Sequence, residues 1–148
     1  MPGGESTSIS NLLKTSGMKN EIIKRQNQGL PLWGTCAGLI IISKEVQEKS
    51  PEPLKLLDVS TSRNYYGRQI DSFIEYIDFD KYSYEGVFIR APAITNIGKN
   101  VNVLAKSKNN IPVAVREGSI LGTTFHPELT DDLRIHSYFL NMTKEVKK

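Results

Sequence analysis

The stretch LPLWGTCAGLIII, residues 30 to 42, contains the only cysteine of the chain, Cys36. An apolar extended run precedes Cys36 and a second apolar run follows it, with glycines between the two. A nucleophile on a sharp turn from strand to helix needs small neighbours, because the strained backbone approaches other elements closely. Gly34 and Gly38 meet that need. The stretch predicts a nucleophile elbow, although a cysteine among aliphatic residues is, by itself, also typical of an inert core position.

The elbow predicts how the cysteine would be activated. At a helix N-terminus, backbone N–H groups and the helix dipole favour the thiolate form of Cys36. The N–H group of Ala37 could point at an oxyanion developing on the substrate. The opening MPGGEST holds two consecutive glycines, whose exposed N–H groups could supply a second donor. We therefore expect an oxyanion hole from Gly3, Gly4 and Ala37, with a plain surface turn as the alternative for the glycine pair alone.

A second fragment, TTFHPEL, lies far downstream at residues 123 to 129. His126 and Glu128 stand two positions apart, so their side chains can lie on one side of an extended or turning backbone. A catalytic cysteine needs a general base, and the base needs a carboxylate that orients it and stabilises the imidazolium. The two fragments together predict a Cys36, His126, Glu128 triad. Taken alone, His126 could equally be a surface histidine in a turn.

Length and composition limit the possible classes of protein. The 148 residues are 39% hydrophobic and 24% charged with a net charge of +3, as expected of one soluble domain. The basic residues are scattered, so no nucleic-acid partner is implied. No apolar run approaches the roughly 18 to 20 residues of a membrane span and no signal peptide is evident, so we expect a cytoplasmic protein. One cysteine and two histidines predict no internal disulfide and no metal site.

Helical patterns occur early and late in the chain, and strand patterns occupy the middle. This order predicts an α/β layered domain with a mixed sheet over residues 1–148. A serine or threonine should cap the first helix, and Thr130 the last, with Asp131 and Asp132 in its first turn. We expect helices over residues 6–17, 18–29, 37–46 and after 130, strands over 30–34, 56–60, 68–78, 86–91 and 101–106, and a hairpin over 112–125 that turns near 117–119.

Five motifs, spread over nearly the whole chain, carry a family resemblance. Together they resemble the glutaminase subunit of the pyridoxal 5′-phosphate synthase complex, a class I (triad) glutamine amidotransferase. The elbow and the histidine motif alone would indicate only the broader class, and the other three narrow it. The motifs are PGGEST (2–7), GTCAGLI (34–40), SRNYYGRQ (62–69), FIRAP (88–92) and GTTFHPELTDDLRIHSYF (122–139).

The resemblance implies roles for individual residues. An amino-acid substrate presents a carboxylate and an ammonium group, so Arg63 or Arg90 could meet the former and Glu5 could influence the latter. The alternative, that both arginines are exposed ion-pair partners, stays open, and His136 is expected to be structural. By resemblance, the triad is Cys36, His126 and Glu128, and the glutamine-binding residues are Gly4, Glu5, Ser6, Arg63, Ile89 and Arg90.

The resemblance also implies a fold and a reaction. The fold would be a three-layer, flavodoxin-like mixed sheet with helices on both faces, lacking the strand-helix-strand that usually precedes PGGES in the family, so we expect an N-terminally truncated glutaminase domain. The chain would hydrolyse L-glutamine and pass ammonia to a (β/α)8-barrel synthase subunit, with no cofactor of its own. A glutaminase serving another synthase, and an inactive fragment or regulatory binding subunit, are the alternatives.

Overall fold

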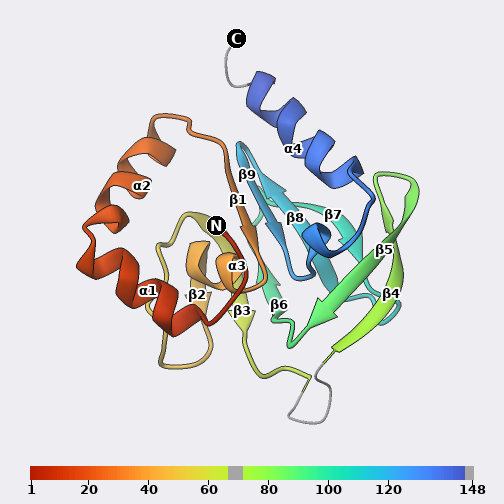
Figure 1. Cartoon of the computed structure of the whole chain (residues 1–148), viewed down its shortest axis with the longest axis horizontal. Helices are drawn as coiled ribbons and strands as arrows, with labels where there is room; N and C mark the ends of the chain where they lie inside the picture. Colours follow the sequence, from red (N-terminus) through yellow and green to blue (C-terminus); the bar gives the residue numbers. More distant parts are fainter. Residues whose placement is uncertain (67–71, 146–148) are drawn as a thin grey trace.

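The computed structural model describes residues 1–66 and 72–145, arranged as strands with helices on either side (Figure 1). The central sheet has four strands in the order β1, β9, β8, β7. β1 runs parallel to β9, with Gly34 opposite Gly122 and Thr35 opposite Thr123, and the other pairs are antiparallel. The bounds are β1 Leu32–Thr35, β7 Asn102–Lys106, β8 Pro112–Glu117 and β9 Ile120–Thr123.

Helices cover both faces of this sheet, as predicted. α3 is wholly buried and packs against one face, where Leu39 and Ile42 join Leu57 and Val115 in an apolar cluster. α4 covers the other face, where Ile135 joins a larger cluster. α1 and α2 lie outside α3 (Figure 1). The helix bounds are α1 Ser6–Thr15, α2 Met18–Asn27, α3 Ala37–Ile42 and α4 Arg134–Glu145, with a short 3-10 helix, η1, at Pro127–Leu129.

Two smaller sheets flank the central one. The first has the order β2, β3, β6, with β2 parallel to β3 and β6 antiparallel to it. The second is the ribbon of β4 and β5, whose inward side chains include the stacked rings of Phe73 and Phe88. The bounds are β2 Ser43–Val46, β3 Leu57–Ser62, β4 Ser72–Phe79, β5 Tyr82–Ile89 and β6 Ala93–Ile97.

Several predicted elements have different bounds. The helix expected over residues 37–46 ends at Ile42, because the Ser43 backbone is extended and its hydroxyl bonds the carbonyl oxygen of Ile40 at 2.7 Å. The following residues form β2 instead. β5 begins at Tyr82, earlier than expected, and β6 was not predicted at all. Part of the strand expected at 68–78 lies outside the described residues, and β4 is described from Ser72 onward.

Two predicted helix caps are wrong. Glu5, rather than a serine or threonine, caps α1, because its carboxylate accepts hydrogen bonds from the backbone N–H groups of Thr7 and Ser8 at 3.0 and 2.7 Å. Thr130 ends η1 instead of starting the last helix. The Asp132 carboxylate accepts a hydrogen bond from the Arg134 N–H at the start of α4. The hairpin of β8 and β9 is confirmed, with Gly118 at φ 55° in its turn.

Candidate active site

Cys36 stands on the sharp turn between β1 and α3. Its φ of 50° and ψ of −106° are unusual for a non-glycine residue, and its backbone N–H donates to the Thr123 carbonyl at 2.8 Å. A Cβ atom on Gly34 would lie 2.6 Å from the Ile42 side chain and 2.7 Å from the Gly38 carbonyl oxygen. The strained turn is therefore held by β9 and by close backbone packing, as expected of a nucleophile elbow.

Met1 lies along the edge of β1 that does not pair with β9, and its backbone holds the elbow in place. The Met1 amino group donates to the Trp33 carbonyl at 2.8 Å, and the Thr35 N–H donates to the Met1 carbonyl at 3.1 Å. A Cβ atom on Gly38 would collide with that Met1 carbonyl. The requirement for glycine at position 38 thus comes from the N-terminal backbone, which the sequence pattern alone did not identify.

His126 and Glu128 form a hydrogen-bonded pair at the start of η1. The distance between His126 Nδ1 and Glu128 Oε1 is 2.7 Å, and the His126 N–H donates to the Val87 carbonyl at 2.8 Å. The His126 side chain is 11% exposed and that of Glu128 50%. With Nδ1 donating to the carboxylate, the tautomer leaves Nε2 with the lone pair that a general base requires.

Gly3 lies between the histidine and the cysteine. A Cβ atom on Gly3 would fall 2.6 Å from His126 Cε1 and 3.7 Å from Cys36 Cβ. The His126 imidazole and the Cys36 side chain therefore both lie next to Gly3 of the N-terminal segment. Gly4 follows with φ 131°, a conformation that other residues rarely adopt. The structure brings both glycines of the PGGEST motif to the elbow.

The thiol is less acidic than the sequence suggested. Burial raises the pKa of Cys36 to about 11, although the Ala37 N–H lowers it and the Glu128 charge raises it slightly further. The N–H at the helix N-terminus therefore favours the thiolate as expected, but burial has the larger effect and raises the pKa of the thiol overall. α3 is short, and the loss of hydration outweighs its N–H groups. The Cys36 Sγ lies 3.8 Å from the Ile89 carbonyl oxygen as a thiol donor.

A pocket of about 440 Å³ opens in front of Cys36. Ser6 is 2% exposed, and its hydroxyl has no hydrogen-bond partner among the described residues. A buried hydroxyl without a partner at the wall of a pocket is suited to a polar ligand atom. Most of the residues predicted to bind substrate or stabilise the oxyanion line this pocket. Its full lining is Gly4, Glu5, Ser6, Cys36, Ala37, Ile40, Arg63, Asn64 and Arg90.

Glu5 and Arg63 contact each other at the pocket. Arg63 Nη2 lies 3.1 Å from Glu5 Oε1, and Nη1 donates to the Ser50 carbonyl at 3.0 Å. Hydrogen bonds from the N–H groups of Thr7 and Ser8 lower the pKa of Glu5 to about 2, so the carboxylate is charged at neutral pH. Both predicted binding residues therefore border the pocket as an ion pair.

Ile89 is the last residue of β5, and Arg90 follows it. Ile89 is 40% exposed and offers its carbonyl to the Cys36 thiol, while Arg90 has φ 43°. His136 lies elsewhere, with its ring 5.1 Å from that of Trp33 in an edge-to-face contact. Sequence reasoning missed Met1, Thr123 and Val87, because all three contribute backbone atoms and no side-chain pattern identifies such atoms.

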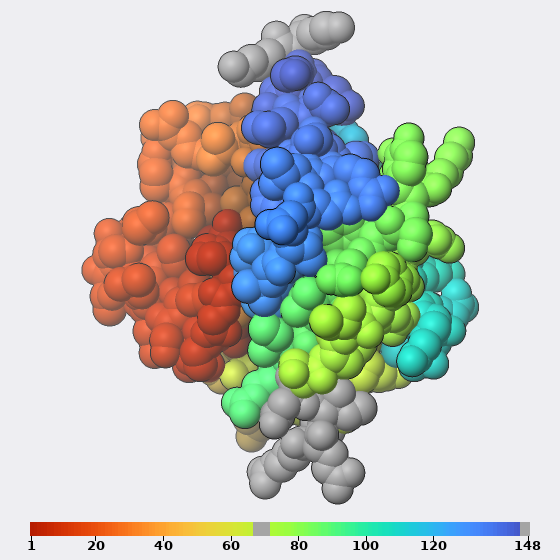
Figure 2. Space-filling model, turned by 45° about the vertical axis from the view of Figure 1, so that its right-hand side comes forward, coloured from red at the N-terminus to blue at the C-terminus, as the bar shows by residue number. Residues whose placement is uncertain are grey.

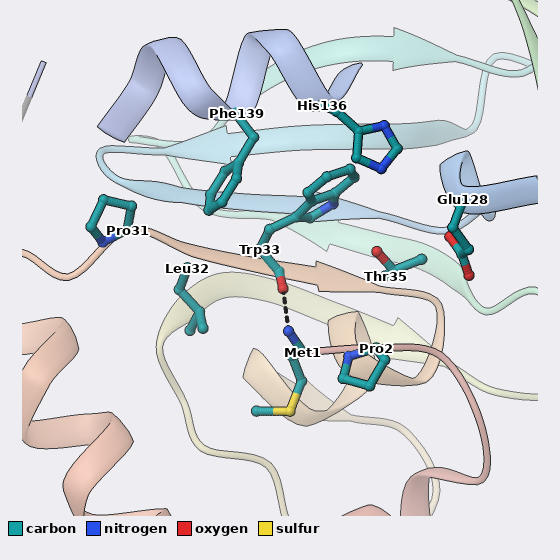
Figure 3. Close-up of a pocket in the computed structure, with 9 residues that line it drawn as sticks. All are labelled: Met1, Pro2, Pro31, Leu32, Trp33, Thr35, Glu128, His136 and Phe139. Carbon is teal, nitrogen blue, oxygen red and sulfur yellow. Dashed lines mark hydrogen bonds between the residues drawn. The ribbon is translucent and has the colours of Figure 1, made fainter. Parts of the chain in front are cut away.

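A second pocket, of about 490 Å³, is lined by Glu128 (Figure 3). Figure 3 shows Trp33, His136 and Phe139 along it, with the Met1 amine bonded to the Trp33 carbonyl. The first residues and the C-terminal part of the chain meet here, as Figure 2 also shows. Cys36 does not line this pocket, so the pocket at Ser6 is the better candidate for substrate.

The described part of the chain contains neither a candidate metal site nor a helix suited to span a membrane. No group of three or more histidine, cysteine, aspartate or glutamate side chains converges as a metal site would require in residues 1–66 and 72–145. None of the helices in these ranges has the length and apolar character that crossing a membrane demands.

Comparisons with known proteins agree on one family. The pyridoxal 5′-phosphate synthase subunit PdxT of Thermotoga maritima is 48% identical over 147 residues, which cover 97% of this chain and 78% of that protein. The PdxT subunit of Thermoplasma volcanium is 51% identical over 143 residues, covering 96% of this chain and 71% of that protein.

A solved structure described as a glutamine amidotransferase superposes with a TM-score of 0.91 at 44% identity, covering 97% of this chain and 77% of that one. The sequence profile of the SNO glutamine amidotransferase family matches residues 1–145. The class I amidotransferase-like α/β fold expected from the sequence is therefore confirmed. This chain belongs to the SNO glutamine amidotransferase family.

Proposed function

We propose that the chain is a glutaminase that hydrolyses the side-chain amide of L-glutamine to glutamate and ammonia. The observation that carries the proposal is the meeting of two groups around Gly3: the Cys36 side chain on its strained elbow, and the His126 imidazole held by Glu128 at 2.7 Å. A thiol, a base with a free Nε2 and an orienting carboxylate are the parts that acyl transfer from an amide requires.

The reaction divides into two steps. His126 Nε2 takes the thiol proton as Cys36 Sγ attacks the amide carbon, which is necessary because burial raises the pKa of the thiol to about 11. The carbon–nitrogen bond then breaks, and the leaving ammonia takes the proton from His126, so that a thioester remains. In the second step His126 deprotonates a water molecule, which attacks the thioester, and the thiol regains its proton as glutamate leaves.

Substrate would occupy the pocket in front of Cys36. Arg63 and Arg90 border it and can attract the α-carboxylate, while Glu5 can attract the ammonium group. The unpartnered Ser6 hydroxyl is available for a further hydrogen bond. The N–H of Ala37, which already points at the thiol, is the candidate oxyanion donor, together with a donor from Gly3 or Gly4.

The names of the relatives support a destination for the ammonia. Those described above are named as PdxT subunits of pyridoxal 5′-phosphate synthase. We extend that role to this chain, which would then deliver ammonia in the cytoplasm to a barrel-shaped synthase subunit. The resemblance noted above for the SRNYYGRQ and FIRAP motifs favours this partner over another synthase.

The test is glutamate release from glutamine, measured with and without the synthase subunit, for the chain and its Cys36→Ala variant. We expect release that depends on Cys36 and increases when the synthase subunit is present. Release that depends on Cys36 but responds only to a different synthase would favour another amidotransferase. No Cys36-dependent release in either condition would contradict the enzyme assignment and favour a regulatory binding role.

A further inference from the structure

Arg63 follows the last residue of β3, and the Glu48 carboxylate holds its main chain through hydrogen bonds. The Glu48 carboxylate oxygen Oε1 accepts three hydrogen bonds: from the Arg63 N–H at 2.8 Å, from the Asn64 N–H at 3.2 Å and from the Ser62 hydroxyl at 3.2 Å. Two successive backbone N–H groups that converge on one carboxylate oxygen form a small anion-binding nest. Glu48 thus holds the three-residue turn that carries Arg63 into the pocket.

Glu48 is itself held in place by the strand before it. The N–H of Gln47 donates to the Thr61 carbonyl at 2.9 Å, which continues the pairing of β2 with β3 beyond Val46. Burial raises the pKa of the Glu48 carboxyl, but hydrogen bonds from its own N–H and from those of Arg63 and Asn64 outweigh burial and hold the pKa below its ordinary value. The carboxylate therefore stays charged at neutral pH, and its hydrogen bonds to the turn are charge-assisted.

The same segment also restrains the far end of the arginine. Arg63 Nη1 donates to the Ser50 carbonyl at 3.0 Å, and Nη2 pairs with Glu5 at 3.1 Å. The main chain of Arg63 is thus fixed by Glu48 and its guanidinium by Ser50, two residues of one loop. Few rotamers of a long side chain satisfy both restraints, so the guanidinium is already ordered at the pocket before any ligand arrives.

We infer that Glu48 is a positioning residue for amino-acid recognition, acting through Arg63; the inference rests on the proposed glutaminase function. Glu48 does not line the pocket that holds Cys36, so it acts on substrate only through the turn. Its loss should weaken the binding of glutamine while leaving the Cys36, His126 and Glu128 chemistry unchanged. An interaction that is equally strong in the substrate complex and in the transition state affects KM rather than kcat.

Three substitutions of Glu48 separate the effect of its side-chain length from the effect of its charge. Glu48→Ala removes the acceptor and should raise KM for glutamine roughly tenfold with kcat within about twofold, because hydrogen bonds to a charged group are lost. Glu48→Asp keeps the charge but shortens the side chain, and should raise KM as well. Glu48→Gln keeps an acceptor oxygen but loses the charge, so it should restore only part of the binding. Glu45→Ala is the matched control, because Glu45 makes a comparable bond to Ser60, away from Arg63.

Covalent labelling of Cys36 provides a second readout that does not need turnover. A diazoketone analogue of glutamine should label the wild-type chain faster than the Glu48→Ala chain, while iodoacetamide, which lacks the amino-acid group, should label both equally. A general loss of stability, followed by the melting temperature, would not create this difference between reagents.

The outcomes separate the two proposals. A wild-type chain that releases no glutamate and shows no preference for the analogue overturns the proposed function and this inference together. A wild-type chain that is active and prefers the analogue, with Glu48→Ala and Glu48→Asp matching it in KM and labelling, overturns the role of Glu48 alone. A lower kcat at unchanged KM in the folded variants would also contradict it.

Discussion

Replacing Gly3 with alanine tests the geometry on which the proposed function depends. The new Cβ atom would lie 2.6 Å from His126 Cε1, whereas ordinary van der Waals contact begins near 3.4 Å, so the ring must move by about 0.8 Å. The ring cannot move freely, because Nδ1 is bonded to Glu128 at 2.7 Å and the His126 backbone to Val87. A displacement of about 1 Å in a reacting group costs roughly a hundredfold in rate.

We therefore expect Gly3→Ala to lower kcat for glutamine hydrolysis about a hundredfold. The crowding should lower the free energy of unfolding by about 1 to 3 kcal/mol. Gly118→Ala is the matched control. Gly118 lies at φ 55° with open space around it, so alanine there should cost about 1 kcal/mol of stability and leave activity unchanged. A Gly3→Ala chain that folds and keeps kcat within about threefold would refute the placement of His126 against Cys36.

Three further predictions concern the triad, the thiol and the core. Glu128→Gln keeps the shape but not the charge beside His126, so kcat should fall about a hundredfold in a glutamate-release assay while KM changes little; an unchanged kcat would contradict the orienting role. Above about pH 9 the unfolded chain loses the Cys36 proton that the folded thiol keeps up to about pH 11, so stability falls by as much as roughly 1.4 kcal/mol per pH unit in that window and is unaffected below it. Urea unfolding of the wild type and of Cys36→Ser at about pH 8 and about pH 10.5 should show this difference, and parallel behaviour would contradict it. Leu39→Ala empties a fully buried position in the cluster with Leu57, so urea unfolding should report a loss of about 3 kcal/mol, and a loss below about 1 kcal/mol would contradict the packing described.

The sequence predicted the elements with strong local signals and missed those defined by distant contacts. The glycines around Cys36 and the turn at Gly118 are such signals, and the elbow and the hairpin form where expected. β2 was not predicted, because its residues, SKEV, follow α3 without an intervening loop and their pattern also fits the end of a helix; pairing with β3 makes them extended. β6 is short and partly exposed, so its pattern is weak.

The candidate site shows the same division. Cys36, His126 and Glu128 could be predicted because side-chain chemistry and spacing identify them. The raised pKa of Cys36 could not, because it depends on how much water the fold removes from the thiol. Glu48 could not either, because two of the three hydrogen bonds that it accepts come from backbone N–H groups, which carry no side-chain signal in the sequence.

The parallel pairing of β1 with β9 has a consequence for how activity would arise during folding. Cys36 directly follows β1, and His126 lies shortly after β9. The hydrogen bond from the Trp33 indole N–H to the Thr123 hydroxyl joins residues 90 positions apart in the sequence. Such non-local pairing forms slowly compared with local helices. In a refolding experiment, far-ultraviolet circular dichroism should recover early, and Cys36-dependent glutamate release should appear only with the late phase in which the two strands meet.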